Sequence, residues 1–98
     1  GRTATMKSVQ EAPLAHYVRE YSALPGLQQA HRVEYTLRRS DTMLCFSARR
    51  SSEAAPVSYY TAALEEVPAC RLLCYLYENS IGPEQLRDVL SDFCGRTL

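Results

Sequence analysis

The sequence predicts a small α+β domain of two layers, in which an N-terminal helix, a three-stranded antiparallel meander and two closing helices follow one another. Apolar and polar residues alternate through residues 32–50, and apolar residues recur at helical spacing before and after that stretch. The length is the third observation, because 98 residues can form one hydrophobic core but not two. We therefore expect helices to cover one face of a single antiparallel sheet.

The N-terminal region divides into two parts. Residues 1–12 are expected to be the end of an upstream helix or coiled coil, or a flexible tail, and the start at glycine suggests a fragment of a longer protein. Residues 13–24 have the spacing of one helical face, with a stop at Pro25 and Gly26. This stripe is expected to form a homodimer interface, or alternatively to pack only on its own sheet, and consists of Leu14, Tyr17, Val18 and Tyr21.

The stretch from 32 to 50 predicts two strands joined by a short polar turn at Ser40 and Asp41. One face of this hairpin is apolar, formed by Val33, Tyr35, Leu37, Leu44, Phe46 and Ala48. A loop over 51–56 and a third strand within 57–64 are expected to follow, because the latter segment is rich in β-branched and aromatic residues. A lone hairpin is barely stable in water, so helices must cover it.

Two closing helices are expected after the sheet. Pro68 marks the start of the first and Asn79 and Ser80 its end, with Ser80 a candidate cap for the helix that follows Gly82 and Pro83. We expect both helices to join the core of the sheet through Leu73, Leu76, Leu90 and Phe93.

Composition excludes several kinds of partner. Eleven basic and eleven acidic side chains cancel, so no overall field favours nucleic acid or an anionic membrane. No apolar run approaches the length of about 20 residues that a membrane span requires. The four cysteines lie within apolar patterns, which favours a reducing compartment. Cys70 and Cys74 are one helical turn apart but lack further ligands nearby in sequence, so we expect neither a metal site nor a cofactor.

The sequence lacks the groupings that enzymes use. There is no glycine-rich phosphate loop, and the acidic residues fall on faces that pattern as exposed. We therefore expect no catalytic residues. The arginines Arg38, Arg39 and Arg49 are more informative, because clustered guanidinium groups can hold a carboxylate or phosphate. The alternative is that they are edge-strand charges that discourage aggregation.

The last third of the chain, YENSIGPEQLRDVLSDFCGRTL (77–98), resembles the end of the mitotic-arrest-deficient-one family of spindle checkpoint proteins. In that family a Ser-Ile pair opens the final helix, a Leu and a Phe follow, and the chain stops after an Arg and a Thr. The corresponding residues here are Ser80, Ile81, Leu90, Phe93, Arg96 and Thr97. Upstream, YSALPG (21–26), HRVEYTLRR and MLCFSARRSS are similar to that family's helix end, first strand and second strand.

The resemblance implies an RWD-like fold over residues 13–98, with a helix that leaves a coiled coil, and a parallel homodimer. It implies a docking domain that targets a checkpoint protein to kinetochores and binds a phosphorylated segment of a checkpoint kinase. The family uses an Arg-Leu-Lys motif for that contact, which falls here at Thr5, Met6 and Lys7, so that only the lysine is kept. The implied location is the nucleus, at kinetochores, the nuclear envelope or a spindle pole.

Two other interpretations of the sequence stay open. Another kinetochore RWD protein, such as a monopolin-like subunit, or a ubiquitin-pathway adaptor of RWD type would share the same architecture. A ubiquitin-conjugating enzyme has a related fold, but the chain lacks the His-Pro-Asn motif that precedes the reactive cysteine of those enzymes. The sequence therefore favours an interaction domain over an enzyme.

Overall fold

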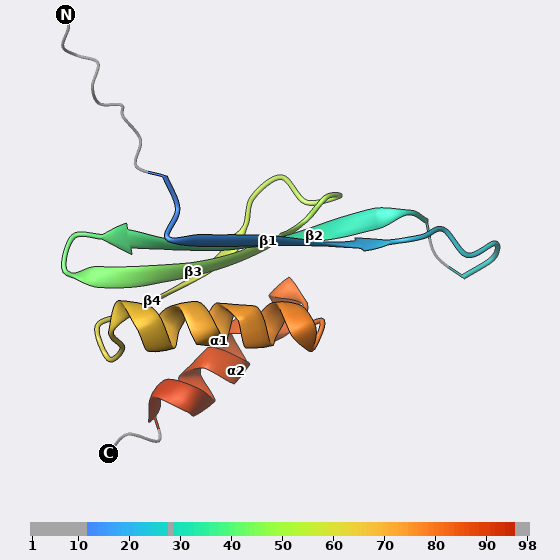
Figure 1. The fold of residues 1–98 in the computed structure, drawn as a ribbon. Coiled ribbons are helices and arrows are strands. Elements are labelled where there is room, and N and C mark those ends of the chain that lie inside the picture. Colours follow the sequence, from blue (N-terminus) through green and yellow to red (C-terminus); the bar gives the residue numbers. More distant parts are fainter. Residues whose placement is uncertain (1–11, 28, 96–98) are drawn as a thin grey trace, which may run out of the picture.

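The computed structural model describes residues 12–27 and 29–95, which form one antiparallel sheet with two helices on one of its faces (Figure 1). The strands pair in chain order, β1-β2-β3-β4, without a crossover. The elements are β1 (Ala15–Tyr21), β2 (His31–Ser40), β3 (Met43–Arg50), β4 (Val57–Thr61), α1 (Glu66–Glu78) and α2 (Pro83–Gly95). The predicted α+β class and the two-layer arrangement are confirmed.

The predicted N-terminal helix is wrong, because its residues form the edge strand β1. Seven consecutive residues of β1 pair with β2, from Ala15 opposite Leu37 to Tyr21 opposite His31. Tyr17 and Tyr21 share a face in a strand as well as in a helix, since a spacing of four satisfies both periods. Aromatic and β-branched residues are also enriched in this segment, which favours a strand.

Pro25 and Gly26 form a turn between β1 and β2 and do not end a helix. The amide of Leu27 donates a hydrogen bond to the carbonyl of Leu24 at 2.9 Å, and Gly26 has a φ of 77°. Proline at the second position and glycine with positive φ at the third are typical of a type II turn. Pro25 and Gly26 therefore do mark a reversal of the chain, but this reversal joins two strands.

The central hairpin is confirmed, with its register set by the apolar face. Tyr35 lies opposite Ala48, and Leu37 lies opposite Phe46. The turn is Asp41–Thr42, one residue later than expected, and Asp41 adopts a φ of 57°. Aspartate tolerates this left-handed conformation better than most residues do. The third predicted strand is also present, as β4.

Both closing helices are confirmed, but α1 begins at Glu66, two residues before the predicted start at Pro68. The link between the helices is ordered by backbone hydrogen bonds. At the end of α1, Ser80 has a φ of 54°, and the amide of Ile81 donates to the carbonyl of Leu76 at 3.0 Å. This is a Schellman motif with serine where glycine is usual, so Ser80 closes α1 and does not cap α2. Gln85 caps α2 instead, since its side-chain oxygen accepts from the amide of Gly82 at 3.2 Å.

The core lies between the helices and the facing side of the sheet. Its buried apolar side chains are Val33, Tyr35, Leu37, Leu44, Phe46, Ala48, Ala69, Leu73, Leu76, Leu86 and Leu90. Phe93 was expected in this core, and that prediction is wrong, because its side chain is 38% exposed. Its ring packs edge-on against Tyr75 at 5.4 Å, on the outside of the helix pair. Neither described helix has the length and apolar character needed to cross a membrane.

Candidate functional site

The sheet face opposite the helices, here called the open face, carries most of the polar side chains of the strands. Side chains alternate between the two faces, so the residues next to each core position point away from the helices. On the three longer strands the open face is formed by His16, Val18, Glu20, Arg32, Glu34, Thr36, Arg38, Cys45, Ser47 and Arg49. The loop 51–56 rises on this side of the sheet in Figure 1.

A shallow pocket of about 200 Å³ lies on the open face between β2, β3 and the loop before β4. Its lining residues are Glu34, Thr36, Arg38, Ser47, Arg49 and Pro56. Two arginines and one glutamate give this pocket an excess of one positive charge, and two hydroxyl groups add hydrogen-bonding capacity. The pocket therefore suits a small anionic group.

Arg49 is partly engaged by its own protein. Its Nη1 donates to the backbone carbonyl of Glu53 at 2.8 Å, and its Nη2 lies 3.6 Å from a carboxylate oxygen of Glu34. Both contacts restrict the guanidinium to one position beside the pocket. The hydroxyl groups of Ser47 and Ser58 lie 3.2 Å apart across β3 and β4, so they share one hydrogen bond.

Arg38 is exposed and has no ion-pair partner within residues 12–27 and 29–95. It sits opposite Cys45 on β3, and Cys45 in turn lies opposite Tyr60 on β4. A hydrogen bond with the Cys45 thiol raises the pKa of the Tyr60 hydroxyl. Arg38 is thus the cation that the pocket can offer to a ligand. It stands at the end of a row that continues across β3 and β4 with Cys45 and Tyr60.

Arg39 lies on the other side of the sheet. Consecutive strand residues point to opposite faces, and Arg39 forms an ion pair with Glu66 at the start of α1. Of the three arginines predicted as one anion site, the structure brings together Arg38 and Arg49 and separates Arg39 from them. Met6 and Lys7, the two other predicted contact residues, lie outside the described residues.

The four residues predicted to form a dimer interface do not share one face. Leu14 precedes β1, while the rings of Tyr17 and Tyr21 pack on the helix side of the sheet. Tyr17 stacks on Tyr77 of α1 with ring centroids 5.0 Å apart. Val18 points to the open face. The helical stripe that motivated this prediction therefore does not exist.

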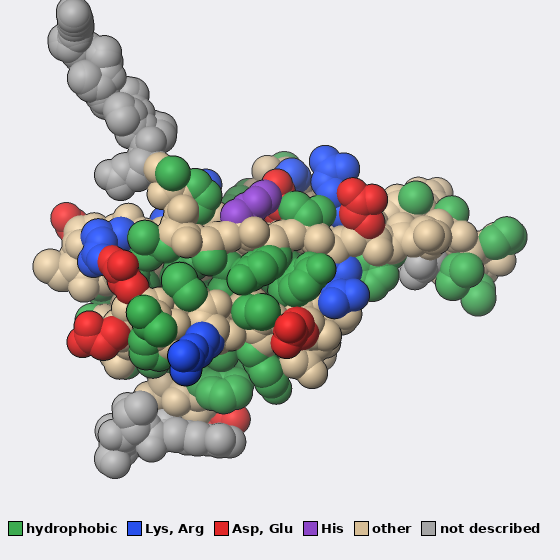
Figure 2. Space-filling view, viewed as in Figure 1, with side chains coloured by type: hydrophobic (Ala, Val, Ile, Leu, Met, Phe, Trp, Pro, Cys, Tyr) green, Lys and Arg blue, Asp and Glu red, His purple; other side chains and the backbone are tan. Residues whose placement is uncertain are grey.

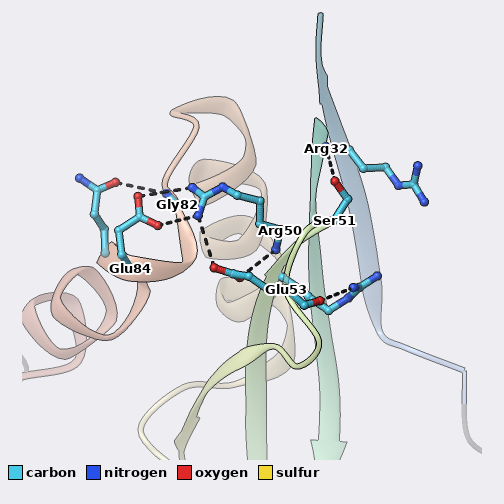
Figure 3. A network of polar contacts seen from close by, with 8 residues as sticks. Arg32, Arg50, Ser51, Glu53, Gly82 and Glu84 are labelled. Carbon is cyan, nitrogen blue, oxygen red and sulfur yellow. Dashed lines mark hydrogen bonds and ion pairs between the residues drawn. The ribbon is translucent and has the colours of Figure 1, made fainter. Parts of the chain in front are cut away.

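A second polar cluster, around Arg50, connects the sheet to α2 (Figure 3). Two guanidinium nitrogens of Arg50 donate to the two carboxylate oxygens of Glu84, at 3.1 and 3.4 Å. Glu53 joins the cluster, 3.5 Å from the same guanidinium. Hydrogen bonding by Arg50 lowers the pKa of the Glu84 carboxyl. The sequence does not predict this cluster, because Arg50 and Glu84 are 34 residues apart and no local pattern links them.

The cluster around Arg50 is better explained as a structural link than as a binding site. Its guanidinium is already held by two carboxylates, so an anionic ligand would have to displace one of them. Ser51 and Arg32 continue the link toward β2, since the Ser51 hydroxyl accepts from the Arg32 amide at 3.1 Å. These contacts hold the end of β3 to the first turn of α2.

Comparison with protein-family models, with curated proteins and with solved structures found no match for this chain. Within the part of the chain that the structure describes, no three histidine, cysteine or acidic side chains are grouped so as to hold a metal ion. What the open-face pocket offers is two guanidinium groups, one of them without an internal counter-ion there, beside serine and threonine hydroxyls.

Proposed function

We propose that this chain is a non-catalytic protein-interaction domain that binds an anionic segment of a partner on its open face, at Arg38 and Arg49. The observation that carries the proposal is the exposed Arg38 guanidinium beside a pocket of about 200 Å³. A guanidinium group presents a fork of N–H donors that matches a phosphate or carboxylate, and such charge-assisted hydrogen bonds are stronger than neutral ones. Arg49 and Ser47 supply further donors to the same group.

Glu34 determines which ligand this pocket prefers. Its carboxylate faces Arg49 at 3.6 Å and offsets part of the positive charge. A dianionic phosphate gains more from the remaining field than a single carboxylate does, because its charge is about −1.5 to −2 at neutral pH. We therefore propose a phosphorylated segment as the ligand.

A kinetochore protein is the partner that the sequence resemblance suggests. The likeness of residues 77–98 to the spindle checkpoint family supports a phosphorylated checkpoint kinase as the ligand and the nucleus as the location. An RWD-like relationship is supported by the order of a strand meander followed by two helices, while the strand at 15–21 departs from the expected N-terminal helix. A monopolin-like subunit and a ubiquitin-pathway adaptor are the alternatives.

The binding test compares Arg38→Ala with wild type on phosphorylated and unphosphorylated checkpoint-kinase peptides, by fluorescence anisotropy. We expect the phosphorylated peptide to bind more tightly, and Arg38→Ala to weaken it about tenfold, since one charge-assisted contact to an exposed group is worth about 1.5 kcal/mol. Arg71→Ala is the matched control, because Arg71 is an exposed arginine on α1. Binding should also weaken as salt increases. Equal affinity for both peptides would refute phosphate recognition.

The cellular proposal needs its own test. A fluorescently tagged chain should gather at kinetochores in dividing cells, and the Arg38→Ala variant should do so less. Diffuse signal for the wild type would reject the kinetochore assignment and leave the anion-binding proposal to the peptide experiment.

A further inference from the structure

The strand β1 lies at one edge of the sheet and pairs with β2 alone among the described strands. An edge strand presents backbone N–H and C=O groups that can pair with another strand. β1 is seven residues long, contains neither proline nor glycine, and pairs with β2 over its whole length without a bulge. This edge is therefore suited to extension of the sheet by another strand.

An apolar strip runs along the same edge. Figure 2 shows hydrophobic side chains gathered between β1 and α1 on the side of the molecule that faces the viewer. The half-buried side chains that β1 and α1 contribute there are Ala15, Tyr17, Cys70, Cys74 and Tyr77. The rings of Tyr17 and Tyr77 stack with centroids 5.0 Å apart and join the two elements at the strip. The neighbouring Cys74 thiol raises the pKa of the Tyr17 hydroxyl. An added strand would cover part of this apolar surface.

Arg19 is already oriented at this edge. Its Nε donates to the carbonyl of Tyr77 at 2.9 Å, and the guanidinium carbon lies 4.7 Å from the centre of the Tyr77 ring. Among the described residues, its two terminal guanidinium nitrogens have no hydrogen-bond partner. An aromatic ring on an added strand could therefore contact the Arg19 guanidinium in the position that it already holds.

We propose that a second copy of this chain pairs with β1 in antiparallel orientation, about a two-fold axis through Val18, to give a continuous eight-stranded sheet. Val18 is the middle residue of β1, so this register pairs all seven residues of each copy. It places His16, whose Nε2 lies 3.3 Å from Glu34 Oε2 of its own chain, opposite Glu20 of the partner subunit as well. Tyr17 lies opposite Arg19 of the partner subunit. Each of these pairs occurs twice, because the axis repeats it.

The charges of β1 favour this register over its neighbours. An axis through Arg19 would set the two Arg19 side chains against each other, and like charges directly opposite are destabilising. An axis through Tyr17 would place His16 opposite Val18 of the partner subunit and lose the pairing with Glu20. Self-complementarity in one register is the reason to propose a second copy and not an unrelated strand.

The test measures the dimer dissociation constant of the 98-residue chain by sedimentation velocity across a concentration series. Val18→Lys places two ammonium groups opposite each other at the axis, and we expect it to raise the dissociation constant at least tenfold. Glu20→Lys should also raise it, because it removes the carboxylate that faces His16 of the partner subunit. The matched control is Ser58→Lys, on the same sheet face but on the opposite edge strand β4, which should leave it unchanged. Circular dichroism melting of each variant checks that it folds.

A photo-crosslinking amino acid at position 18 tests the register. We expect crosslinked dimers whose linked peptides both come from residues 15–21. A strictly monomeric wild type, a dimer that Ser58→Lys disrupts and Val18→Lys does not, or crosslinks outside β1 would each overturn the proposal. The result does not depend on the anion pocket, because Arg38→Ala should leave the dissociation constant unchanged, so the two proposals can fail separately.

Discussion

Ser80 holds a left-handed backbone conformation at the end of α1, with a φ of 54°. Such a conformation costs an L-residue about 1–2 kcal/mol, whereas glycine adopts it without a steric penalty. A glycine at position 80 would remove this cost, but part of the gain in stability would be lost because glycine has more conformational freedom in the unfolded chain. Ser80→Gly should therefore raise the free energy of unfolding by about 0.5–1 kcal/mol, measured by urea denaturation. Ser80→Ala is the control and should bring no gain, since alanine keeps the Cβ atom.

Tyr35 is fully buried, and its hydroxyl donates a hydrogen bond to the carbonyl of Ile81 at 2.8 Å. Tyr35→Phe removes the donor and leaves that carbonyl unsatisfied, so we expect a loss of about 1–2 kcal/mol in the free energy of unfolding. Tyr75→Phe, at a 42% exposed side chain, should cost little by comparison. An equal loss in both variants would argue against the role of this hydrogen bond.

Tyr35 also makes the free energy of unfolding depend on pH in the alkaline range. Burial raises the pKa of Tyr35 to about 12 from its ordinary value of 10. Between pH 10 and 12 the folded state thus keeps a proton that the unfolded state releases. The contribution of Tyr35 to the free energy of unfolding is therefore complete below pH 10 and is lost as pH rises from 10 to 12. Denaturation midpoints across that range should fall less steeply for Tyr35→Phe than for wild type. Tyr75→Phe should keep the steep decline.

Glu84 is an exposed carboxylate with a bidentate partner, and its effect has the opposite sign. Arg50 lowers its pKa, so the stabilisation is present above the ordinary carboxyl range and is lost as pH falls through the lowered value. The Glu84 side chain is 63% exposed, so solvent screening limits the contribution to below about 1 kcal/mol. Glu84→Gln should cost that much at pH 7 and nothing at pH 2, while Asp88→Asn, on the same helix, should be near neutral at both.

At the scale of elements, α2 attaches to the sheet through its inner leucines and not through its aromatic residue. Leu90 is fully buried, whereas Phe93 is 38% exposed. Leu90→Ala should lower the free energy of unfolding by about 2–5 kcal/mol, as buried leucine truncations do. Phe93→Ala should cost about 1 kcal/mol or less, because the ring is partly exposed and packs edge-on against Tyr75. Chemical denaturation of both variants decides this, and a larger cost for Phe93→Ala would place the last turn of α2 in the core.

The elements predicted correctly from the sequence are those whose apolar periodicity fits only a strand or only a helix. The hairpin face through Tyr35 and Phe46 fits a strand alone, and the leucines of α1 fit a helix alone. At residues 14–21 the apolar spacing fitted both, and only pairing with β2 decides between them. Phe93 continued the apolar stripe of α2, but its ring lies against Tyr75 and is 38% exposed, which a sequence pattern does not reveal.

The candidate site was predicted only in part for the same reason. Arginine clusters were visible in the sequence, but alternation along the strand divides Arg38 from Arg39. The contacts of Arg50 with Glu84 depend on how the helices return to the sheet. Local patterns therefore identified the residue types, while the tertiary fold decided which side chains meet.

For the whole molecule, the two proposals act on one surface. Pairing of β1 with a second copy would join two open faces into a single one, with an Arg38 pocket on each half. A partner with two phosphorylated segments could then engage both pockets, and its second contact would be intramolecular. Dimerisation would in this way raise the apparent affinity of a ligand without changing either pocket.

The strict chain order of the sheet also affects how the domain folds. Each strand pairs with its neighbour in sequence, so each hairpin closes only a short loop before the next is added. The longest closure is the return of α1 to β1, which the hydrogen bond from Arg19 to the carbonyl of Tyr77 spans across 58 residues. Mixed α/β domains with mostly local pairing fold faster than sandwiches whose strands come from distant parts of the chain. The apolar face of β1 therefore gains its helical cover only when this long closure forms, and until then it is a surface through which unfinished chains can aggregate.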